Sequence, residues 1–554
     1  MKEGAVMNHL DQTRTPLFDA LKEYVNRDTL PFHVPGHKKG IGMDDEFKNF
    51  IGENPFKIDV TVFKLVDSLH HPKGPIKEAQ ELAADAYGAD ATFFSIHGTS
   101  GAIQAMIMSV VSDGDKIIVP RNVHKSVTAG IILSGAVPVY MEPELDKKLG
   151  IAHGVAPETV KQTLEVNPDA KAVLIINPTY YGVATDIKKI ADIVHEYNIP
   201  LIVDEAHGPH LAFSDKLPTS ALEAGADICA QSTHKIIGAL TQGSLLHVKS
   251  KLVNPKRVQQ VLNLMQTTSP SYILMASLDC ARRQIALEGK ELLSKAIDLC
   301  NYTRSEINKI PGFHCFGKEV LGVPGSFAFD PTKLTISCRG LGITGYELDT
   351  ILADKYHIQM ELSDFYNVLA VGSFGDTKEG MDKLISALKE ISNEYYGKKP
   401  ATKDFLDIPH IPNRILNPRE AFNSKKEDIL LEKSGADIAC TALFDSANGF
   451  DEKVTMRDII NNYPFPNTFK VIELSGKDIK LAIERSASYF DIVNHKITVN
   501  KEFLEPKPQH FNYDIFAGIQ YTIHVGHPYG ERVSDLQINR SEERRVGKEC
   551  RSRW

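Results

Sequence analysis

The chain of 554 residues lacks the features that mark membrane and secreted proteins. No stretch approaches the roughly 18 consecutive apolar residues of a membrane span, and the N-terminal stretch "MKEGAVMNHLDQTRTPLFDALKEYV" has no apolar core of a signal peptide. The 7 cysteines form no CxxC pair, which disfavours a disulfide framework and a zinc site. We therefore expect a cytoplasmic protein that associates with no membrane and binds no metal.

An excess of positive charge is absent as well. The net charge is −8 and the basic residues are scattered, so we expect no nucleic-acid surface. The letters "DEAH" at 204–207 spell a helicase motif, but no GxxxxGK[ST] phosphate loop occurs in the chain, and this excludes a P-loop helicase. Small acidic or zwitterionic ligands remain compatible with this charge balance.

Between about residues 70 and 250, short apolar runs alternate with helical patterns. The runs that predict strands are "ATFFSIHG", "DKIIVP", "AVPVYM", "AVLIIN", "IPLIVD" and "ADICAQS". Alternating βα units build a mostly parallel sheet that binds ligands at the carboxyl ends of its strands. A helical stretch at about 272–310 leads into a smaller α+β domain with strands "GSFAFD", "KLTISC", "HIQMEL" and "NVLAVGSF", and a linker follows. The sequence therefore predicts an α/β protein with a second, α+β domain.

Several polar residues stand where these strands end. Asp204 directly follows an apolar strand, and Thr99 and Ser100 lie where a strand gives way to a helix, which is a typical anion site. Ser232 and Lys235 belong to "QSTHKIIGALTQGS". Taken singly, each residue has a simpler explanation: helix capping for the two hydroxyls, a solvated carboxylate, and a lysine that reaches to water.

One chemistry uses all five residues together. Pyridoxal phosphate (PLP) requires a helix N-terminus and hydroxyls for its phosphate, a carboxylate for its ring nitrogen, and a lysine amine for its aldehyde. The five residues supply these groups, so the set favours a PLP site over five unrelated surface positions.

Several blocks resemble one family. The stretches "PFHVPGHKKG", "HHPKGPIKEAQELAADAYGAD", "HGTSGA", "RNVHKS", "VDEAHGPH" and "STHKIIGALTQGS" are similar, in this order, to the Orn/Lys/Arg decarboxylases, which are PLP-dependent enzymes of fold type I. The resemblance covers residues of about 10–424. It implies a PLP fold type I large domain with a mostly parallel sheet.

The resemblance also implies roles for individual residues. Lys235 corresponds to the lysine that forms the Schiff base with PLP, and Asp204 to the partner of the ring nitrogen. His124 corresponds to the histidine stacked on the ring, and His207 stands where the family has a residue close to the cofactor. The phosphate and cofactor contacts implied are Thr99, Ser100, Ser232 and His234.

Two further segments bear on partner and substrate. "QTTSPSY" resembles a segment that reaches the cofactor of a neighbouring subunit, with Thr268 as the contact, which implies a homodimer or a higher oligomer with shared active sites. "QMELSDFYN" resembles a stretch with an acidic residue near the substrate, where Glu361 is favoured over Asp364. A buried cation of the substrate requires such a carboxylate; a pair of solvated carboxylates is the open alternative.

The implied reaction is decarboxylation of a basic amino acid. The chain resembles the short members of the family, because no receiver-like domain precedes "TPLFDALKEYV", and this favours arginine over lysine or ornithine. Lys235 or His234 is then the proton donor to the α-carbon. Another PLP reaction, such as aminotransfer, requires the same cofactor residues and stays open.

The character of the chain changes after about residue 424. Residues of about 427–540 resemble the C-terminal, nucleotide-recognising domain of the 5′-nucleotidase family, and "SEERRVGKECRSRW" at the end resembles translated adaptor sequence. The change indicates a chimeric gene product. Two alternatives to a working decarboxylase therefore stay open: a chimera with a PLP site but no turnover, and a nucleotide-binding module without catalysis. The expected segments are an N-terminal segment (1–70), a PLP-binding domain (71–290), a small α+β domain (291–400), an interrupted decarboxylase C-terminal domain (401–426), the nucleotidase-like α+β segment of different origin (427–540) and the tail (541–554).

Overall fold

The computed structural model describes residues 10–401, 411, 414–424, 439–443, 473–493, 496–503, 513–538 and 552–553. The chain forms two compact units, Met1–Pro412 and Asn413–Trp554. Much of the expected nucleotidase-like segment, and of the tail at 541–554, lies outside the described residues. Among the helices that are described, none has the length and apolar character needed to cross a membrane.

The first unit is built on a seven-stranded sheet with the strand order β1-β10-β9-β8-β6-β2-β3. Strand β10 runs antiparallel to its neighbours β1 and β9, and the pairs from β9 to β3 are parallel. The sheet therefore confirms the α/β fold that the sequence predicts, but β10 ("SLLHV") was not among the expected strands. The strands are β1 (Ala91–Ser95), β2 (Lys116–Pro120), β3 (Val137–Met141), β6 (Ala172–Ile176), β8 (Leu201–Asp204), β9 (Ile228–Gln231) and β10 (Ser244–Val248).

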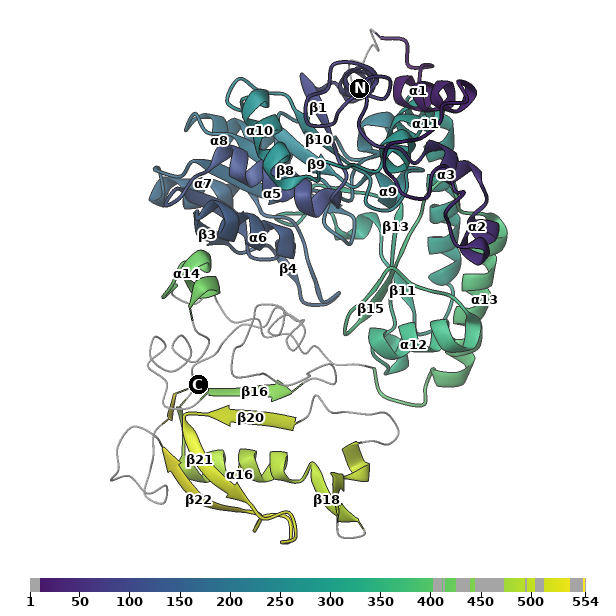
Figure 1. Cartoon of the computed structure of the whole chain (residues 1–554). Helices are drawn as coiled ribbons and strands as arrows, with labels where there is room; N and C mark the ends of the chain where they lie inside the picture. The colour runs from purple at the N-terminus through teal and green to yellow at the C-terminus, as the bar shows by residue number, and fades with distance from the viewer. Residues whose placement is uncertain are drawn as a thin grey trace. The chain divides into compact units, whose positions relative to one another are not determined.

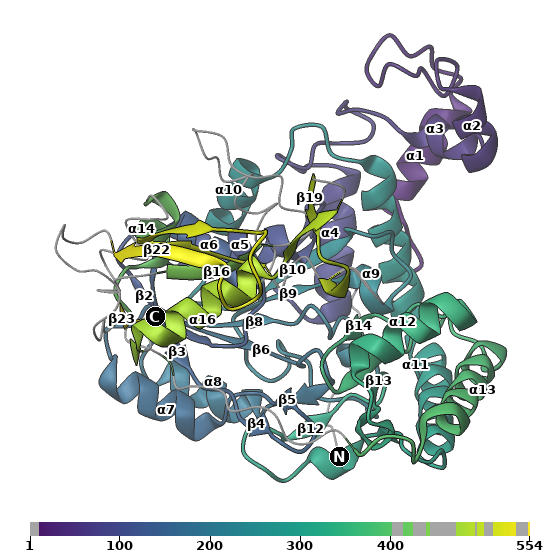
Figure 2. The same ribbon diagram turned by 90° about the horizontal axis from the view of Figure 1, so that it is seen from below.

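Helices cover both faces of this sheet (Figures 1 and 2). Successive residues of β2 point to opposite faces: Ile117 and Val119 belong to one apolar core and Ile118 to the other. Because both faces are buried, a ligand reaches the sheet at its strand ends. The helices of the first core are α5 (Gly98–Val110), α6 (Lys125–Ser134) and α10 (Pro255–Met265), and those of the second are α7 (Pro157–Val166) and α8 (Ile187–His195).

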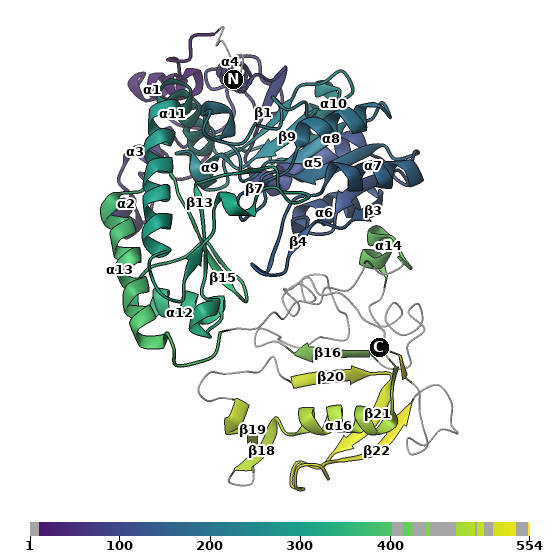
Figure 3. The same cartoon turned by 180° about the vertical axis from the view of Figure 1, so that it is seen from behind.

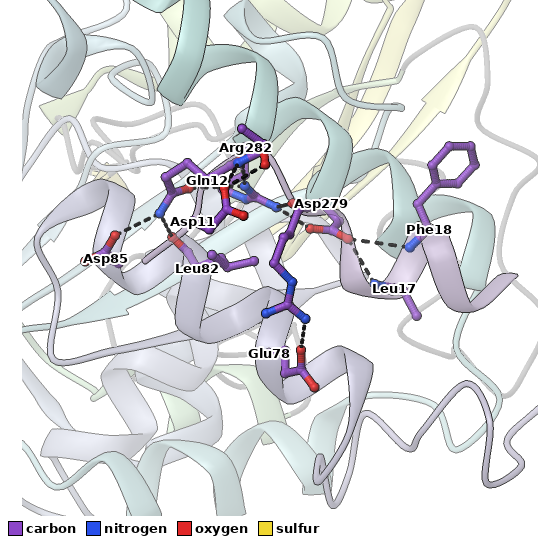
Figure 4. Close-up of polar contacts among 11 residues, drawn as sticks. Asp11, Gln12, Leu17, Phe18, Glu78, Leu82, Asp85, Asp279 and Arg282 are labelled. Atoms are coloured by element: carbon purple, nitrogen blue, oxygen red, sulfur yellow. Dashed lines mark hydrogen bonds and ion pairs between the residues drawn. The ribbon is translucent and has the colours of Figure 1, made fainter. Parts of the chain in front are cut away.

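A buried ion pair fastens the N-terminal segment to the long helix α11 (Tyr272–Ile307) (Figure 4). Arg282 and Asp279 are fully buried, with Nη2 and Oδ1 2.7 Å apart. Arg282 also donates to the main-chain oxygen atoms of Gln12 (2.7 Å) and Arg14 (2.6 Å), and Asp279 accepts from Leu17 N (3.0 Å). The chain leading into α1 is thus held by charged side chains that bind main-chain groups. The helices of the N-terminal part are α1 (Pro16–Asn26), α2 (Asp45–Ile51), α3 (Asn54–Ile58) and α4 (Pro75–Tyr87).

A smaller antiparallel sheet, β11-β13-β15-β14, forms the α+β part of the first unit. Helices α11 and α13 run side by side along it (Figure 3). The stretch "GSFAFD", expected in this sheet, instead forms β12 (Ala328–Phe329), which pairs with β7 (Val183–Ala184). Of "HIQMEL", only the last residue enters a strand. The elements are β11 (His314–Cys315), β13 (Lys333–Ser337), α12 (Gly345–Tyr356), β14 (Leu362–Ser363), β15 (Asn367–Val371) and α13 (Lys378–Tyr395).

In the second unit, helix α16 (Gly476–Ala487) packs through Ile479 and Ile483 against Ile519 and Val533. Glu484, on the same helix, is buried and its carboxylate accepts hydrogen bonds from three main-chain N–H groups of residues 530–533. The other described elements are α14 (Pro418–Asn423), β16 (Ala439–Leu443), β17 (Glu473–Leu474), β18 (Phe490–Val493), β19 (Lys496–Val499), β20 (Tyr513–Ala517), β21 (Ile519–Ile523), β22 (Val533–Ile538) and β23 (Ser552–Arg553).

Candidate active site

A cavity of about 700 Å³ opens at the carboxyl ends of the central strands of the first unit. Its walls come from the starts of α5 and α6, the end of β8 with the loop that follows, and the short helix α9 (Thr233–Ile236). Segments far apart in sequence therefore meet at one place. The candidate residues that line the cavity are Thr99, Ser100, His124, Asp204, His207, Ser232, His234 and Lys235.

The N-terminus of α5 faces this cavity. Its N-cap residue, His97, makes no side-chain cap, so the first-turn N–H groups are not closed off by a capping side chain. The hydroxyl of Thr99 does not cap the helix either; its Oγ1 lies within hydrogen-bond distance of Ser232 Oγ and of Ser244 Oγ (2.8 Å). The capping explanation for Thr99 is thereby replaced by a contact that joins α5 to the segment before Lys235. A helix N-terminus flanked by hydroxyls can hold a phosphate.

Asp204 ends strand β8 at the cavity wall. The side chain is 4% exposed, and among the described residues its one hydrogen bond comes from Ala206 N (3.1 Å). Burial raises the pKa of Asp204 to about 6, although Ala206 and the charge of Lys235 oppose this. A cation placed beside Asp204 would favour its ionised form.

Lys235 and His207 are in direct contact at the wall of the cavity. Lys235 Nζ lies 2.6 Å from His207 Nε2, and burial, together with the charge of Lys333, lowers the pKa of Lys235 against the opposing effect of Asp204. Burial and the charge of Lys235 hold the pKa of His207 well below its usual value, so its imidazole is neutral. When Lys235 is protonated, Nε2 is the acceptor and the ring proton is on Nδ1, which is buried without a partner among the described residues. A lysine with a lowered pKa is suited to act as a nucleophile.

Two more histidines of the cavity are held by main-chain groups. His124 is the N-cap of α6, where Nδ1 accepts from Ser126 N (3.2 Å), and burial lowers its pKa. His234 has Nδ1 at 3.0 Å from the carbonyl oxygen of Gly243. Since that oxygen can only accept, the proton of a neutral His234 is on Nδ1 and Nε2 is an acceptor.

Tyr180 is a cavity residue that was not among the candidates. Its ring centroid lies 5.1 Å from Lys235 Nζ and 4.0 Å from the ring centroid of His207. Its hydroxyl donates to Glu361 Oε1 (2.6 Å), and burial raises its pKa, so the phenol stays protonated. The signal was present in the sequence, because "PTYYG" directly follows the expected strand "AVLIIN".

Three candidates do not line the cavity. Glu361 reaches it through Tyr180, and Asp364 accepts from the hydroxyl of the next residue, Tyr181 (2.8 Å). Asp364 Oδ1 also accepts from the main-chain N–H groups of residues 366 and 367, so Glu361 has the more available carboxylate. Thr268 is exposed on the segment between α10 and α11 and does not line the cavity of its own chain.

The donor set of this cavity fits PLP. A primary amine, a buried carboxylate and a helix N-terminus with hydroxyls are the three groups that the cofactor requires, and the unpartnered Nδ1 of His207 adds a free donor. Across the described part of the chain, no group of three or more His, Cys, Asp or Glu is arranged to hold a metal ion.

A mostly parallel sheet with this cavity at its strand ends defines the class of PLP-dependent enzymes of fold type I. The constitutive lysine decarboxylase of Escherichia coli has a similar fold, with a TM-score of 0.64 at 19% identity over 92% of this chain and 81% of that one. A lysine decarboxylase of Francisella novicida gives a TM-score of 0.62 at 27% identity, over 69% of this chain and 60% of that one.

Sequence comparison narrows the class to one family. Residues 15–380 match the Orn/Lys/Arg decarboxylase major domain. The chain is 52% identical over 433 residues to an arginine decarboxylase of Bacillus anthracis and 48% identical over 433 residues to one of Bacillus subtilis, in each case over 78% of this chain and 88% of the relative. The chain belongs to the Orn/Lys/Arg decarboxylase family, whose members depend on PLP. Residues 422–546 match the C-terminal domain of 5′-nucleotidase, which confirms the second resemblance.

Proposed function

We propose that this protein removes the α-carboxylate of arginine as CO2, and that it does so with PLP bound in the cavity of the first unit. The observation that carries this proposal is the meeting of Lys235, Asp204 and the N-terminus of α5 at one cavity. Arginine is favoured over lysine and ornithine because the relatives that are about 50% identical to this chain are arginine decarboxylases. We place the reaction in the cytoplasm, because the described cysteines are free thiols.

The cavity residues divide into holding and proton-handling groups. When bound, PLP supplies the electron sink that makes loss of CO2 possible. Lys235 would hold the cofactor covalently, and Asp204 would keep a proton on its ring nitrogen. The start of α5 would bind the phosphate, with Thr99, Ser100 and Ser232 supplying hydroxyls, and His124 would stack on the ring.

Proton return to the α-carbon is assigned to Lys235 or to the imidazolium form of His234, in which Nε2 carries a proton. Lys235 Nζ lies 2.6 Å from Nε2 of neutral His207, so its amine has a fixed acceptor, and burial lowers its pKa. His207 thereby orients the amine that exchanges the proton.

Recognition of the guanidinium is assigned to Glu361, with Asp364 as the second carboxylate. Glu361 is hydrogen-bonded to Tyr180, whose ring faces Lys235, so it stands one side chain away from the reacting end of the cavity. A carboxylate binds a guanidinium through two parallel hydrogen bonds, which an ammonium does not allow.

We further propose a homodimer in which Thr268 contacts the partner's cofactor. Thr268 is exposed and does not line its own cavity. Large apolar side chains on residues 30–51 are also exposed, among them Phe32 (94%) and Phe50 (88%), and such a surface is typical of protein association. Light scattering should give twice the chain mass, and Thr268→Ala should weaken PLP binding without changing that mass; a monomer with full PLP affinity would overturn this assignment.

The test is to incubate the purified protein with PLP and, separately, with arginine, lysine and ornithine. Release of CO2 and of the matching amine in equal amounts, fastest from arginine, is the expected result. Formation of a keto acid without CO2 would instead indicate aminotransfer. Bound PLP with no product from any of the three amino acids would favour a chimeric product that keeps the site but lacks turnover.

A further inference from the structure

Behind the cavity wall lies a cluster of buried charged side chains. Lys333, Asp330 and His210 are each 0% exposed. Lys333 Nζ donates to Asp330 Oδ2 (2.8 Å) and to Thr332 Oγ1 (3.2 Å), and His210 Nε2 lies 3.2 Å from Asp330 Oδ2. Although burial opposes it, Lys333 and His210 hold the pKa of Asp330 well below its usual range. None of these residues lines the cavity.

The cluster forms hydrogen bonds to the main chain of two segments, the one that carries His207 and the one that carries Tyr180. The rings of these two residues contact Lys235. Lys333 Nζ donates to the main-chain oxygen of His207 (3.4 Å), and Asp330 N donates to the main-chain oxygen of Gly182 (2.8 Å), two residues after Tyr180. The approach at Gly182 is close: its φ is +87°, and a Cβ there would lie 2.9 Å from Lys333 Cβ. Asp330 directly follows strand β12 and Lys333 is the first residue of β13, so the α+β part of the unit supplies these contacts.

Stability alone does not account for this arrangement. A buried ion pair is often no more stabilising than a packed apolar pair of the same volume. In the Lys333–Asp330 pair, the lysine also donates a hydrogen bond to the main-chain oxygen of His207, the residue that contacts Lys235 Nζ.

We propose that Asp330, Lys333 and His210 are positioning residues for the decarboxylation, which fix the main chain of His207 and so hold its imidazole against Lys235 Nζ. This inference rests on the proposed function, in which Lys235 handles the proton. The titratable or charged groups that face Lys235 or act on it through space are Asp204, His207, Glu361, Tyr180, His124 and Lys333.

The deciding variant is Lys333→Met/Asp330→Asn, which neutralises the pair and leaves no isolated buried charge. Reductive methylation of the ligand-free protein, followed by peptide mass spectrometry, measures the reactivity of the Lys235 amine without any turnover. Loss of the Lys333 donor releases the main chain of His207, whose imidazole then no longer holds Lys235 Nζ, so at pH 8 we expect the methylation rate of Lys235 to change by about 3-fold or more. With arginine, kcat should fall about 10- to 100-fold and KM should change less than about 3-fold, as expected for misplacement in the catalytic step.

A matched control is Arg282→Met/Asp279→Asn. This pair is likewise three residues apart and 0% exposed, but it binds the N-terminal segment (Figure 4). It should lower Tm and leave the methylation rate of Lys235 in the folded protein unchanged. Thr332→Val, which removes a hydroxyl that accepts from Lys333 Nζ and keeps the shape, should change the methylation rate of Lys235 in the same direction by about 2-fold, and decides the matter if the double variant does not fold.

A lowered Tm with unchanged Lys235 methylation and unchanged kcat would show that the cluster is only structural and would overturn the proposal. If the proposed function were wrong, the result would be different. The parent protein would release no CO2, but the methylation rate of Lys235 would still differ between the parent and the variants.

Discussion

Each unit of this chain contains a buried carboxylate, and the two are used in opposite ways. Glu484 in the second unit accepts from Gly530 N (3.1 Å), Arg532 N (3.2 Å) and Val533 N (2.8 Å), so its oxygens are occupied by one loop. Asp204 in the first unit accepts only from Ala206 N among the described residues, and it faces a cavity that also contains Lys235. The difference teaches that burial alone does not mark a functional carboxylate. What marks Asp204 is remaining acceptor capacity directed at a cavity.

The two sites also differ in how far apart in the sequence their contacting residues lie. Glu484 and its partners are within 49 positions of each other in sequence. The contacts of the cavity span longer separations, such as 133 positions between Thr99 and Ser232 and 181 between Tyr180 and Glu361. Changes at the cavity residues of the first unit should therefore affect turnover, and changes in the second unit should affect only the stability of that unit.

The largest effect is expected for Lys235→Ala. Without the amine, the covalent hold on PLP is lost, so kcat with arginine should fall by about 10⁴-fold or more, as for the loss of a covalent catalytic residue elsewhere. The visible absorbance of the lysine-bound cofactor should disappear. Lys295→Ala, an exposed lysine paired with Glu291 in the same unit, is the control and should keep both. Retained absorbance in Lys235→Ala would move the covalent site to another lysine.

The next largest effect is expected for Asp204→Asn. The variant keeps the shape of the side chain but cannot hold the ring nitrogen protonated, so kcat should fall by about 10²–10³-fold while PLP stays bound, in line with the loss of one electrostatic partner. Steady-state kinetics with arginine and the cofactor absorbance measure the two quantities. Undiminished turnover would contradict the role of Asp204.

Asp204 also predicts a pH dependence of the ligand-free protein. Its pKa is about 6 in the folded state against 3.8 for the unperturbed group, so ionisation on raising the pH destabilises the folded chain. The neutral amide of the Asp204→Asn variant carries no such penalty, so from pH 4 to pH 7 the stability of this variant relative to the parent should increase by about 3 kcal/mol. Urea unfolding at the two pH values measures this difference, and a constant difference would show that Asp204 is not buried as described.

A smaller effect is expected for Glu361→Gln. The loss of one carboxylate that binds the guanidinium should raise KM for arginine by about 10-fold or more and leave kcat within about 3-fold. Asp364→Asn is the comparison, because its oxygens are already engaged by main-chain N–H groups, and it should change KM less. If the two variants exchanged these effects, the substrate carboxylate would be Asp364.

The smallest effect on turnover is expected for Glu484→Gln. Removing a charged acceptor of three N–H groups should destabilise the second unit by about 1–3 kcal/mol. Turnover of arginine should stay within about 2-fold of the parent. A large loss of turnover would contradict the expectation that changes in the second unit affect only the stability of that unit.

Much of the candidate site was accessible from the sequence because its parts sit in short contiguous stretches. Asp204 ends a strand, and Ser232 and Lys235 lie within four positions of each other, so strand ends and residue types sufficed to make them candidates. His234 was implied by the family resemblance. Tyr180 was missed although its position after a strand carried the same signal.

Other features could not be read from neighbouring residues. Lys333 looks like an ordinary lysine at the start of a strand, and its contact to His207 joins residues 126 positions apart. The same holds for β12, which pairs with β7 across more than a hundred residues instead of joining the sheet that follows it in sequence. Such pairings depend on tertiary packing, which overrides local pattern.

The most direct test of the central claim is to load the protein with PLP, reduce it with borohydride, and locate the attached cofactor by peptide mass spectrometry. Reduction makes the link between the cofactor and its lysine permanent. The account predicts the added mass on the peptide that contains Lys235, at one cofactor per chain. Attachment at a different lysine, or none at saturating PLP, would contradict it.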